Sequence, residues 1–241
     1  GTVTLTDGSD GDGLAVSANG SGSILIDANT AGSAILVNAN VVSGTGHVTL
    51  KAADGIDVAA GVAILTSTAG TISVDAEGGA LTMSGTSVMT ATGSSLRLHA
   101  SKDITVGNLT AGDVSLVSDT GAIVNAVGST KNVTATNLRM NSDDAIGAAN
   151  RHMTTAVTNV TAQSAGTTTS GMYVTEDDAV TVTGVAVTVT DFNADGTTTV
   201  VTDGSQSDLT SGLNGNVVLV TLNGTVTLTD GSDGDGLAVS A

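Results

Sequence analysis

The chain has 241 residues and a formal net charge of -17 at pH 7, with no cysteine and no proline. This charge disfavours binding to nucleic acid or to an anionic membrane surface, and the lack of cysteine excludes disulfides and thiol chemistry. No segment approaches the roughly 18 apolar residues of a membrane span, so we expect no membrane insertion. One Tyr, one Phe and no Trp favour a thin core of Val, Ile, Leu and Ala, as in a solenoid.

The first 18 residues return at the other end of the chain. Residues 1–18 read GTVTLTDGSDGDGLAVSA, and residues 224–241 are identical to them. This identity predicts a tandem array in which residues 1–223 form one complete unit and residues 224–241 begin the next, continuous with the same solenoid. We expect both copies to share one conformation, with the second copy the better ordered. The alternative is a duplicated segment at the two ends of a single domain.

Each copy contains the acidic run DGSDGDG, at residues 7–13 and 230–236. Asp7, Asp10 and Asp12 could share a cation, since hard divalent ions prefer carboxylate oxygens. The spacing fits no standard calcium loop. A solvated turn is the alternative, because Asp, Gly and Ser are common turn residues.

An apolar residue recurs every 24 residues at Ile24, Val48, Ile72 and Leu96. Apolar and polar residues alternate after each of them, as in a strand with one face inward. The second inward position of successive segments holds Ile26, Leu50, Val74, Leu98 and Leu116. The fifth position is small, at Ala28, Ala52, Ala76 and Ala100, and indicates a corner of the chain.

Further short apolar pairs separated by Gly, Asp, Asn and Ser follow each of these segments. Ile56 and Val58 follow residues 48–50, and Ile104 and Val106 follow residues 96–98. A turn of about 22–24 residues with three short strands is one rung of a right-handed parallel β-helix. About ten rungs fit in one unit, which should advance about 45–50 Å.

The pattern is less regular after residue 142. Residues 143–153 lack periodicity and are predicted to form a loop. Val160, Ala162 and Ser164 resemble another first strand. The stretch from residue 172 to residue 204 contains strong strands with irregular spacing. Val218 and Val220, followed by Val226 and Leu228, are predicted to restore a first and a second strand.

Rungs such as HVTLKAADGIDVAAGVAILTSTAG and DVSLVSDTGAIVNA resemble the filamentous-haemagglutinin-like β-helix. The resemblance is good over about residues 24–140 and looser elsewhere. That family comprises very large bacterial exoproteins and adhesins. The resemblance implies export across the outer membrane, a long rod, and a role in attachment or cell–cell contact. It supplies no catalytic residue.

The motif DFNADG, at residues 191–196, is the sharpest local signal for a ligand. Asp191, Asn193 and Asp195 alternate before Gly196, as in the first half of a calcium-binding EF-hand loop. The glutamate that such a loop carries at its twelfth position is absent. The sequence therefore offers calcium as a candidate cofactor at Asp191, Asn193 and Asp195, with an ordinary Asn/Asp/Gly turn as the alternative.

These features favour a structural or adhesive repeat unit of a giant bacterial secreted or cell-surface protein, and not an enzyme. The expected partners are neighbouring units stacked head to tail, and cell-surface glycans or proteins. One alternative is a polysaccharide-active enzyme that uses Glu176, Asp177 and Asp178. The other is a calcium-stabilised module that binds ice or another surface through its Thr-x-Thr motifs. His47, His99 and His152 are predicted to be surface residues.

Overall fold

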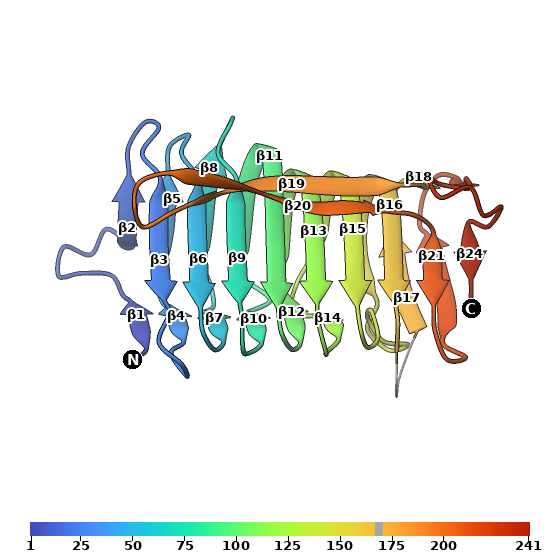
Figure 1. Cartoon of the computed structure of the whole chain (residues 1–241), viewed down its shortest axis with the longest axis horizontal. Coiled ribbons are helices and arrows are strands. Elements are labelled where there is room, and N and C mark those ends of the chain that lie inside the picture. Colours follow the sequence, from blue (N-terminus) through green and yellow to red (C-terminus); the bar gives the residue numbers. More distant parts are fainter. Residues whose placement is uncertain (167–170) are drawn as a thin grey trace.

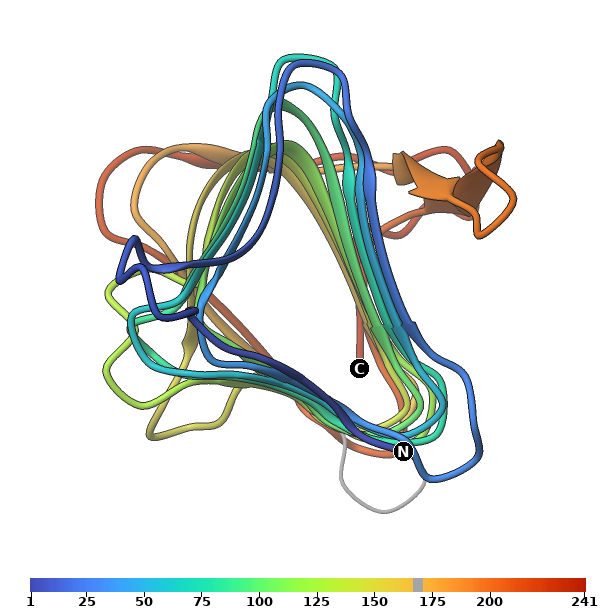
Figure 2. The ribbon, with the colours of Figure 1, turned by 90° about the vertical axis from the view of Figure 1, so that its left-hand side faces the viewer.

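The computed structural model describes residues 1–166 and 171–241. All regular secondary structure in these residues consists of β-strands. The strands wind into a parallel β-helix of triangular cross-section, with the two termini at opposite ends of the long axis (Figures 1 and 2). From the N-terminal end the chain turns clockwise as it recedes, so the winding is right-handed (Figure 2). Within the described residues, no helix could cross a membrane.

Each side of the triangle is a parallel sheet, and we name each sheet by its first strand. The β1 face consists of short strands: β1 (Val3–Leu5), β4 (Ile35–Val37), β7 (Ile56–Val58), β10 (Leu81–Met83), β12 (Ile104–Val106) and β14 (Ile123–Asn125). The β2 face begins with β2 (Leu14–Ala18), β5 (Asn40–Ser43) and β8 (Ala63–Ser67). The β3 face begins with β3 (Ile24–Ala28), β6 (Val48–Ala52) and β9 (Ile72–Ala76).

Four long strands then pass from the β2 face through a corner onto the β3 face: β11 (Val88–Ala100), β13 (Asn108–Ser118), β15 (Val133–Ser142) and β16 (Met153–Ser164). The β2 face ends with β17 (Gly171–Glu176) and β22 (Asn216–Thr221). The β3 face ends with two divided levels, β18 (Val180–Val182) with β21 (Leu209–Ser211), and β23 (Val226–Leu228) with β24 (Val239–Ser240). These strands give the β3 face nine levels, close to the ten rungs predicted.

The strand registers confirm the period of 24 residues. Ile24 pairs with Val48, Val48 with Ile72, and Ile72 with Leu96. Four of the predicted inward residues are fully buried, and Ile26 in the first level is partly buried against the same core. The small corner residues are also buried, at Ala28, Ala52, Ala76 and Ala100. Aliphatic side chains from successive rungs therefore stack into one continuous core without aromatic residues.

An antiparallel hairpin departs from the parallel topology. It consists of β19 (Val185–Phe192) and β20 (Thr198–Gln206). The hairpin lies outside the triangle and runs along the solenoid axis, across the strands of the β3 face (Figures 1 and 2). It accounts for the irregular spacing after residue 172, because its residues belong to no rung.

The hairpin is an insertion into one strand of the β3 face. Val182 pairs with Val160 and Leu209 pairs with Ala162, so β18 and β21 continue each other along β16. A single residue, opposite Thr161, would bridge them in register. The intervening residues 183–208 form the hairpin and its two connections instead.

The two identical segments take different paths, so the prediction of a shared conformation is wrong. In the first copy, Val3 lies on the β1 face and pairs with Ile35. In the second copy, Val226 lies on the β3 face and pairs with Val180. Leu5 is 9% exposed and its counterpart Leu228 is 55% exposed, so the first copy is the more buried one.

The cause of this difference is the position of β22. This strand pairs with β17 on the β2 face and is not the first strand that Val218 and Val220 predicted. The next strand after it, β23, therefore reaches the β3 face, where the sequence predicted a second strand. The assignment of residues 1–223 and 224–241 to successive array units remains a prediction.

Candidate functional site

The hairpin covers the outward side of the β3 face with an apolar surface. Val185, Val187 and Val189 of β19 point toward the solenoid and are each at most 4% exposed. Four of the outward side chains of the β3 face beneath the hairpin are small and polar, and they are also buried: Thr49, Ser73, Ser115 and Thr161. The β3 face thus has a second covered layer outside the main core.

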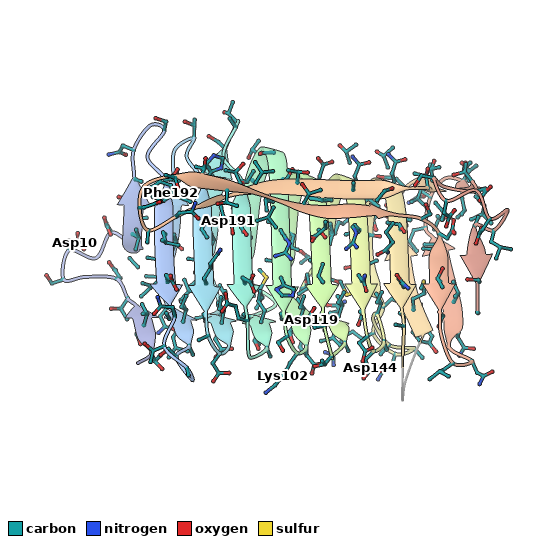
Figure 3. All side chains as sticks on the ribbon, viewed as in Figure 1. Asp10, Lys102, Asp119, Asp144, Asp191 and Phe192 are labelled. Atoms are coloured by element: carbon teal, nitrogen blue, oxygen red, sulfur yellow. The ribbon has the colours of Figure 1, made fainter. Side chains whose placement is uncertain are left out.

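An ion pair holds the tip of the hairpin on β6. The Lys51 Nζ atom lies 2.8 Å from Asp191 Oδ2, and the Asp191 side chain is only 6% exposed. Burial lowers the pKa of the Lys51 ammonium, but the hydrogen bond and the charge of Asp191 outweigh it and leave that pKa raised. Beside this pair, the Phe192 backbone N–H donates to Thr49 Oγ1 at 2.9 Å. Asp191 and Phe192 lie where the hairpin crosses the first strands of the β3 face (Figure 3).

Two arginines hold the second strand of the hairpin further along the solenoid. The Arg97 Nε atom donates to both carboxylate oxygens of Asp203, at 3.1 and 3.0 Å. The Arg139 Nε atom donates to the Gly204 carbonyl at 3.1 Å. Both arginines occupy outward slots of the β3 face, and Arg97 Nη1 also lies 3.9 Å from Asp75 Oδ2 on the neighbouring strand β9.

A polar cavity of about 540 Å³ lies at the base of the hairpin, where β20 returns to the solenoid. Its walls come from three parts of the chain: the β3 face, the end of the hairpin, and the acidic run of the second copy. Among the described residues, five buried side-chain atoms lack a hydrogen-bond partner, and three of them belong to residues that line this cavity: Arg139 Nη1, Gln206 Oε1 and Asp208 Oδ1.

Three carboxylates converge at this cavity. Asp208, Asp233 and Asp235 each offer an oxygen, and these oxygens lie within 4.8 Å of one another. Asp208 is only 4% exposed, whereas Asp233 and Asp235 are exposed. Burial, followed by the negative charges of Asp233, Asp235 and Asp230, raises the pKa of Asp208 to about 6. A buried carboxylate surrounded by other carboxylates is costly unless a cation or a proton joins it.

The acidic run of the first copy also gathers its carboxylates. Asp7, Asp10 and Asp12 each offer an oxygen within 4.8 Å of the others, as the sequence suggested, and all three residues are exposed. Asp10 lies on a loop that projects from the N-terminal end (Figure 3). The turn that ends each run is the same in both copies, because Leu14 N donates to Asp12 and Leu237 N donates to Asp235, each at 2.8 Å. Within the described part of the chain, only the second copy adds a hydrogen bond from Gly236 N to Asp230, at 3.0 Å.

The predicted calcium residues lie at the turn of the hairpin, where each bonds to the protein itself. Asp191 faces Lys51, as described above. The Asn193 amide nitrogen donates to Thr197 and Thr199, at 3.0 and 2.9 Å. Asp195 accepts from the backbone N–H and the hydroxyl of Thr197, which lower the pKa of that carboxyl. Calcium binding at Asp191, Asn193 and Asp195 remains a prediction.

The carboxylate run of the enzyme alternative has mainly structural contacts. Glu176 is 1% exposed and accepts hydrogen bonds from the Thr155 hydroxyl at 2.6 Å and the Val157 backbone N–H at 3.0 Å. Asp177 forms an ion pair with Lys131. These contacts hold one corner of the solenoid together.

Asp208 and Gln206, the buried polar residues of the cavity, were not singled out from the sequence. They lie within the irregular stretch, and nothing local shows that residue 208 meets residue 233. The sequence signal nearest to them is the alternation of Val185, Val187 and Val189 with polar residues, which indicates a strand with one buried face. It predicts the hairpin strand and not the cavity at its base.

The fold defines the chain as a right-handed parallel β-solenoid with an inserted hairpin across one face. Comparison with protein-family models, with curated proteins and with solved structures finds no match to this chain.

Proposed function

We propose that this chain is a structural or adhesive repeat unit, a segment of the rod of a giant bacterial protein displayed outside the cell. The observation that carries the proposal is the stacking of rungs in constant register over the first levels of the β3 face. In such solenoids each rung contacts only its neighbours, and length grows with the number of rungs. A protein built this way sets distance and presents long, flat faces.

The resemblance of residues 47–70 and 113–126 to filamentous-haemagglutinin-like rungs supports this proposal and suggests the family and its bacterial origin. The net charge of -17 agrees with exposure of the chain to a polar medium. Cell-surface glycans or proteins are the proposed partners along the faces, and neighbouring units are the proposed partners at the ends.

The C-terminal end supports head-to-tail stacking. Among the described residues, most of the exposed large apolar side chains belong to the last levels: Leu213, Val220, Leu222, Val226, Leu228, Leu237 and Val239. Strands β22, β23 and β24 pair on one side only, so their other edges keep free backbone groups. Unpaired edges beside apolar side chains are a template for another strand layer. The first level of a second copy would supply such a layer.

The location can be tested on intact cells of the source organism with antibodies raised against residues 1–241. We expect labelling of unpermeabilised cells and loss of the signal after brief treatment with external protease. Labelling that requires lysis, and a signal that external protease leaves unchanged, would contradict display outside the cell.

A further inference from the structure

The cavity at the base of the hairpin combines an acidic cluster with buried, unpartnered oxygen atoms. Gln206 and Asp208 are 9% and 4% exposed, and both line the cavity. The Gln206 Oε1 and Asp208 Oδ1 atoms have no hydrogen-bond donor. Buried polar atoms without a partner are rare in folded proteins, and each calls for water, an ion or another ligand. The Asp208 carboxylate lies in the cluster with Asp233 and Asp235, and Gln206 lines the same cavity, so the site calls for a ligand that accepts oxygen lone pairs.

We propose that Asp208, Asp233 and Asp235, with the Gln206 amide oxygen in the same cavity wall, bind a divalent cation, and that this cation is calcium. Calcium takes six to eight oxygen ligands from carboxylates, amides and water in irregular geometry, which suits donors from two separate loops. The three carboxylates supply more negative charge than the ion neutralises, so the bound site keeps a small net negative charge.

The position of the cluster gives the ion a structural role. Asp208 is the last residue before β21, where the hairpin rejoins the solenoid. Asp233 and Asp235 belong to the loop between β23 and β24, which leaves the next level of the β3 face at the corresponding point. The cation therefore joins the hairpin of one level to the acidic loop of the next.

The two copies of the acidic run provide a matched comparison. Asp10 and Asp12 correspond to Asp233 and Asp235 in an identical sequence, but their cluster consists of exposed residues only. The first copy therefore has the same loop without a buried carboxylate. If the buried oxygens define the site, only the second copy should matter for tight binding.

The test uses the full chain, with calcium chloride titrated in a calorimeter and in thermal melts near pH 7.5. We expect saturable binding and a rise in Tm of about 5–10 °C at a calcium concentration a hundredfold above the Kd. Asp208→Asn keeps the shape of the side chain, and Asn accepts the left-handed backbone found at Asp208, where φ is 69°. This variant should lose the calcium-dependent rise and melt higher than the natural chain without calcium, because it removes carboxylate repulsion.

Two further variants define the position of the site. The pair Asp233→Asn and Asp235→Asn should lose the rise as Asp208→Asn does. The matched pair Asp10→Asn and Asp12→Asn should keep it, and so should Asp195→Asn at the hairpin turn. No heat at millimolar calcium, an undiminished rise in Asp208→Asn, or loss of the rise in either control would overturn the proposal. An equal rise with magnesium would overturn the choice of calcium.

Discussion

At the scale of single residues, the hairpin depends on a few charged side chains that are buried only when it lies on the β3 face. The Asp191 carboxylate has one cationic partner, Lys51, at 2.8 Å. Its other oxygen, Oδ1, is buried without a hydrogen-bond partner. Removing the lysine would leave a buried charge without compensation, which costs more than the loss of a surface ion pair.

We therefore expect Lys51→Ala to lower the free energy of unfolding by about 1–3 kcal/mol. Hydrogen exchange should show the loss first in β19. Adding Asp191→Asn to this variant should restore part of the stability, since a neutral amide is cheaper to bury than a carboxylate. Lys102→Ala, at an exposed lysine, is the control and should change little. If Lys51→Ala and Lys102→Ala had equal effects, the anchoring role of Lys51 would be wrong.

We expect His99 to make the free energy of unfolding depend on pH. Its Nδ1 atom lies 2.8 Å from Asp75, and its Nε2 atom lies 3.1 Å from Asp119. The hydrogen bond to Asp75 is the main cause that raises the pKa of His99, while burial and Arg97 act against it. A group with a higher pKa in the folded state stabilises fully below its unfolded pKa of about 6.5. That contribution is lost as the pH rises through the folded pKa.

The variant His99→Gln should therefore destabilise the protein by about 1 kcal/mol more at pH 5.5 than at pH 9. Chemical denaturation at the two pH values measures this difference. Burial lowers the pKa of His47, so His47→Gln is the matched control and should show the opposite trend. A destabilisation by His99→Gln that is the same at both pH values would show that the Asp75 and Asp119 contacts do not favour the charged imidazole.

At the scale of elements, the rungs could be predicted from the sequence and the hairpin could not. The 24-residue spacing of Ile24, Val48, Ile72 and Leu96 placed the strands of the β3 face, because stacked inward residues must repeat with the rung. An insertion breaks this repeat without leaving a period of its own. The alternation in residues 185–192 predicts a strand, but it does not state that the partner is β20 or that the pair crosses the β3 face.

The candidate site could not be predicted from the sequence either, because it also depends on where the rungs are interrupted. Asp208 and Asp233 meet because two levels of the β3 face are interrupted at the same point, between Val182 and Leu209 and between Leu228 and Val239. The acidic run itself was visible as a candidate cation loop. Its buried partner depends on the register of β21 along β16, which only the folded chain defines.

If the hairpin is an insertion into one strand, removing it should join β18 and β21 in register. Replacing residues 183–208 with a single Thr should fuse β18 and β21 into one strand along β16. We expect this variant to fold, with exchange protection of the core strands retained, because the face exposed by the deletion carries polar residues such as Thr49 and Ser73. Circular dichroism and hydrogen exchange measure the outcome.

A two-residue replacement is the control for this experiment. It shifts the following strand by one position, which turns Leu209 from the core to the outside and should destabilise the last levels strongly. If the two replacements were equally stable, β18 and β21 would not be one interrupted strand. Failure of the single-Thr variant to fold would show that the hairpin is needed for the solenoid.

At the scale of the whole molecule, the open apolar end should drive association. We expect end-to-end dimers and longer assemblies that increase with protein concentration in analytical ultracentrifugation. Leu228→Asp, at a residue that is 55% exposed on the last level, should weaken them at least tenfold. Val127→Asp is the control, since Val127 is 78% exposed but lies at a corner in the middle of the rod. Equal effects of the two variants would indicate non-specific association.

The two 18-residue copies follow different paths, whereas the proposed tandem array requires them to follow the same one. A seamless array requires residues 224–241 to lie on the same faces as residues 1–18. In this structure the strands of residues 1–18 lie on the β1 and β2 faces, whereas both strands of residues 224–241 lie on the β3 face. The turn that precedes Leu14 and Leu237 is already the same in the two copies. We predict that the rungs of a following unit, by pairing with residues 224–241, move this segment onto the β1 and β2 faces.

The most direct test of the rod is electron microscopy of a protein in which residues 1–223 are followed by residues 1–241. Nine levels about 4.8 Å apart span about 38 Å in the single chain. We predict one straight, unbroken rod close to twice that length, with parallel strands continuing through the junction. Two separate bodies joined by a flexible hinge, or units packed side by side, would contradict the account.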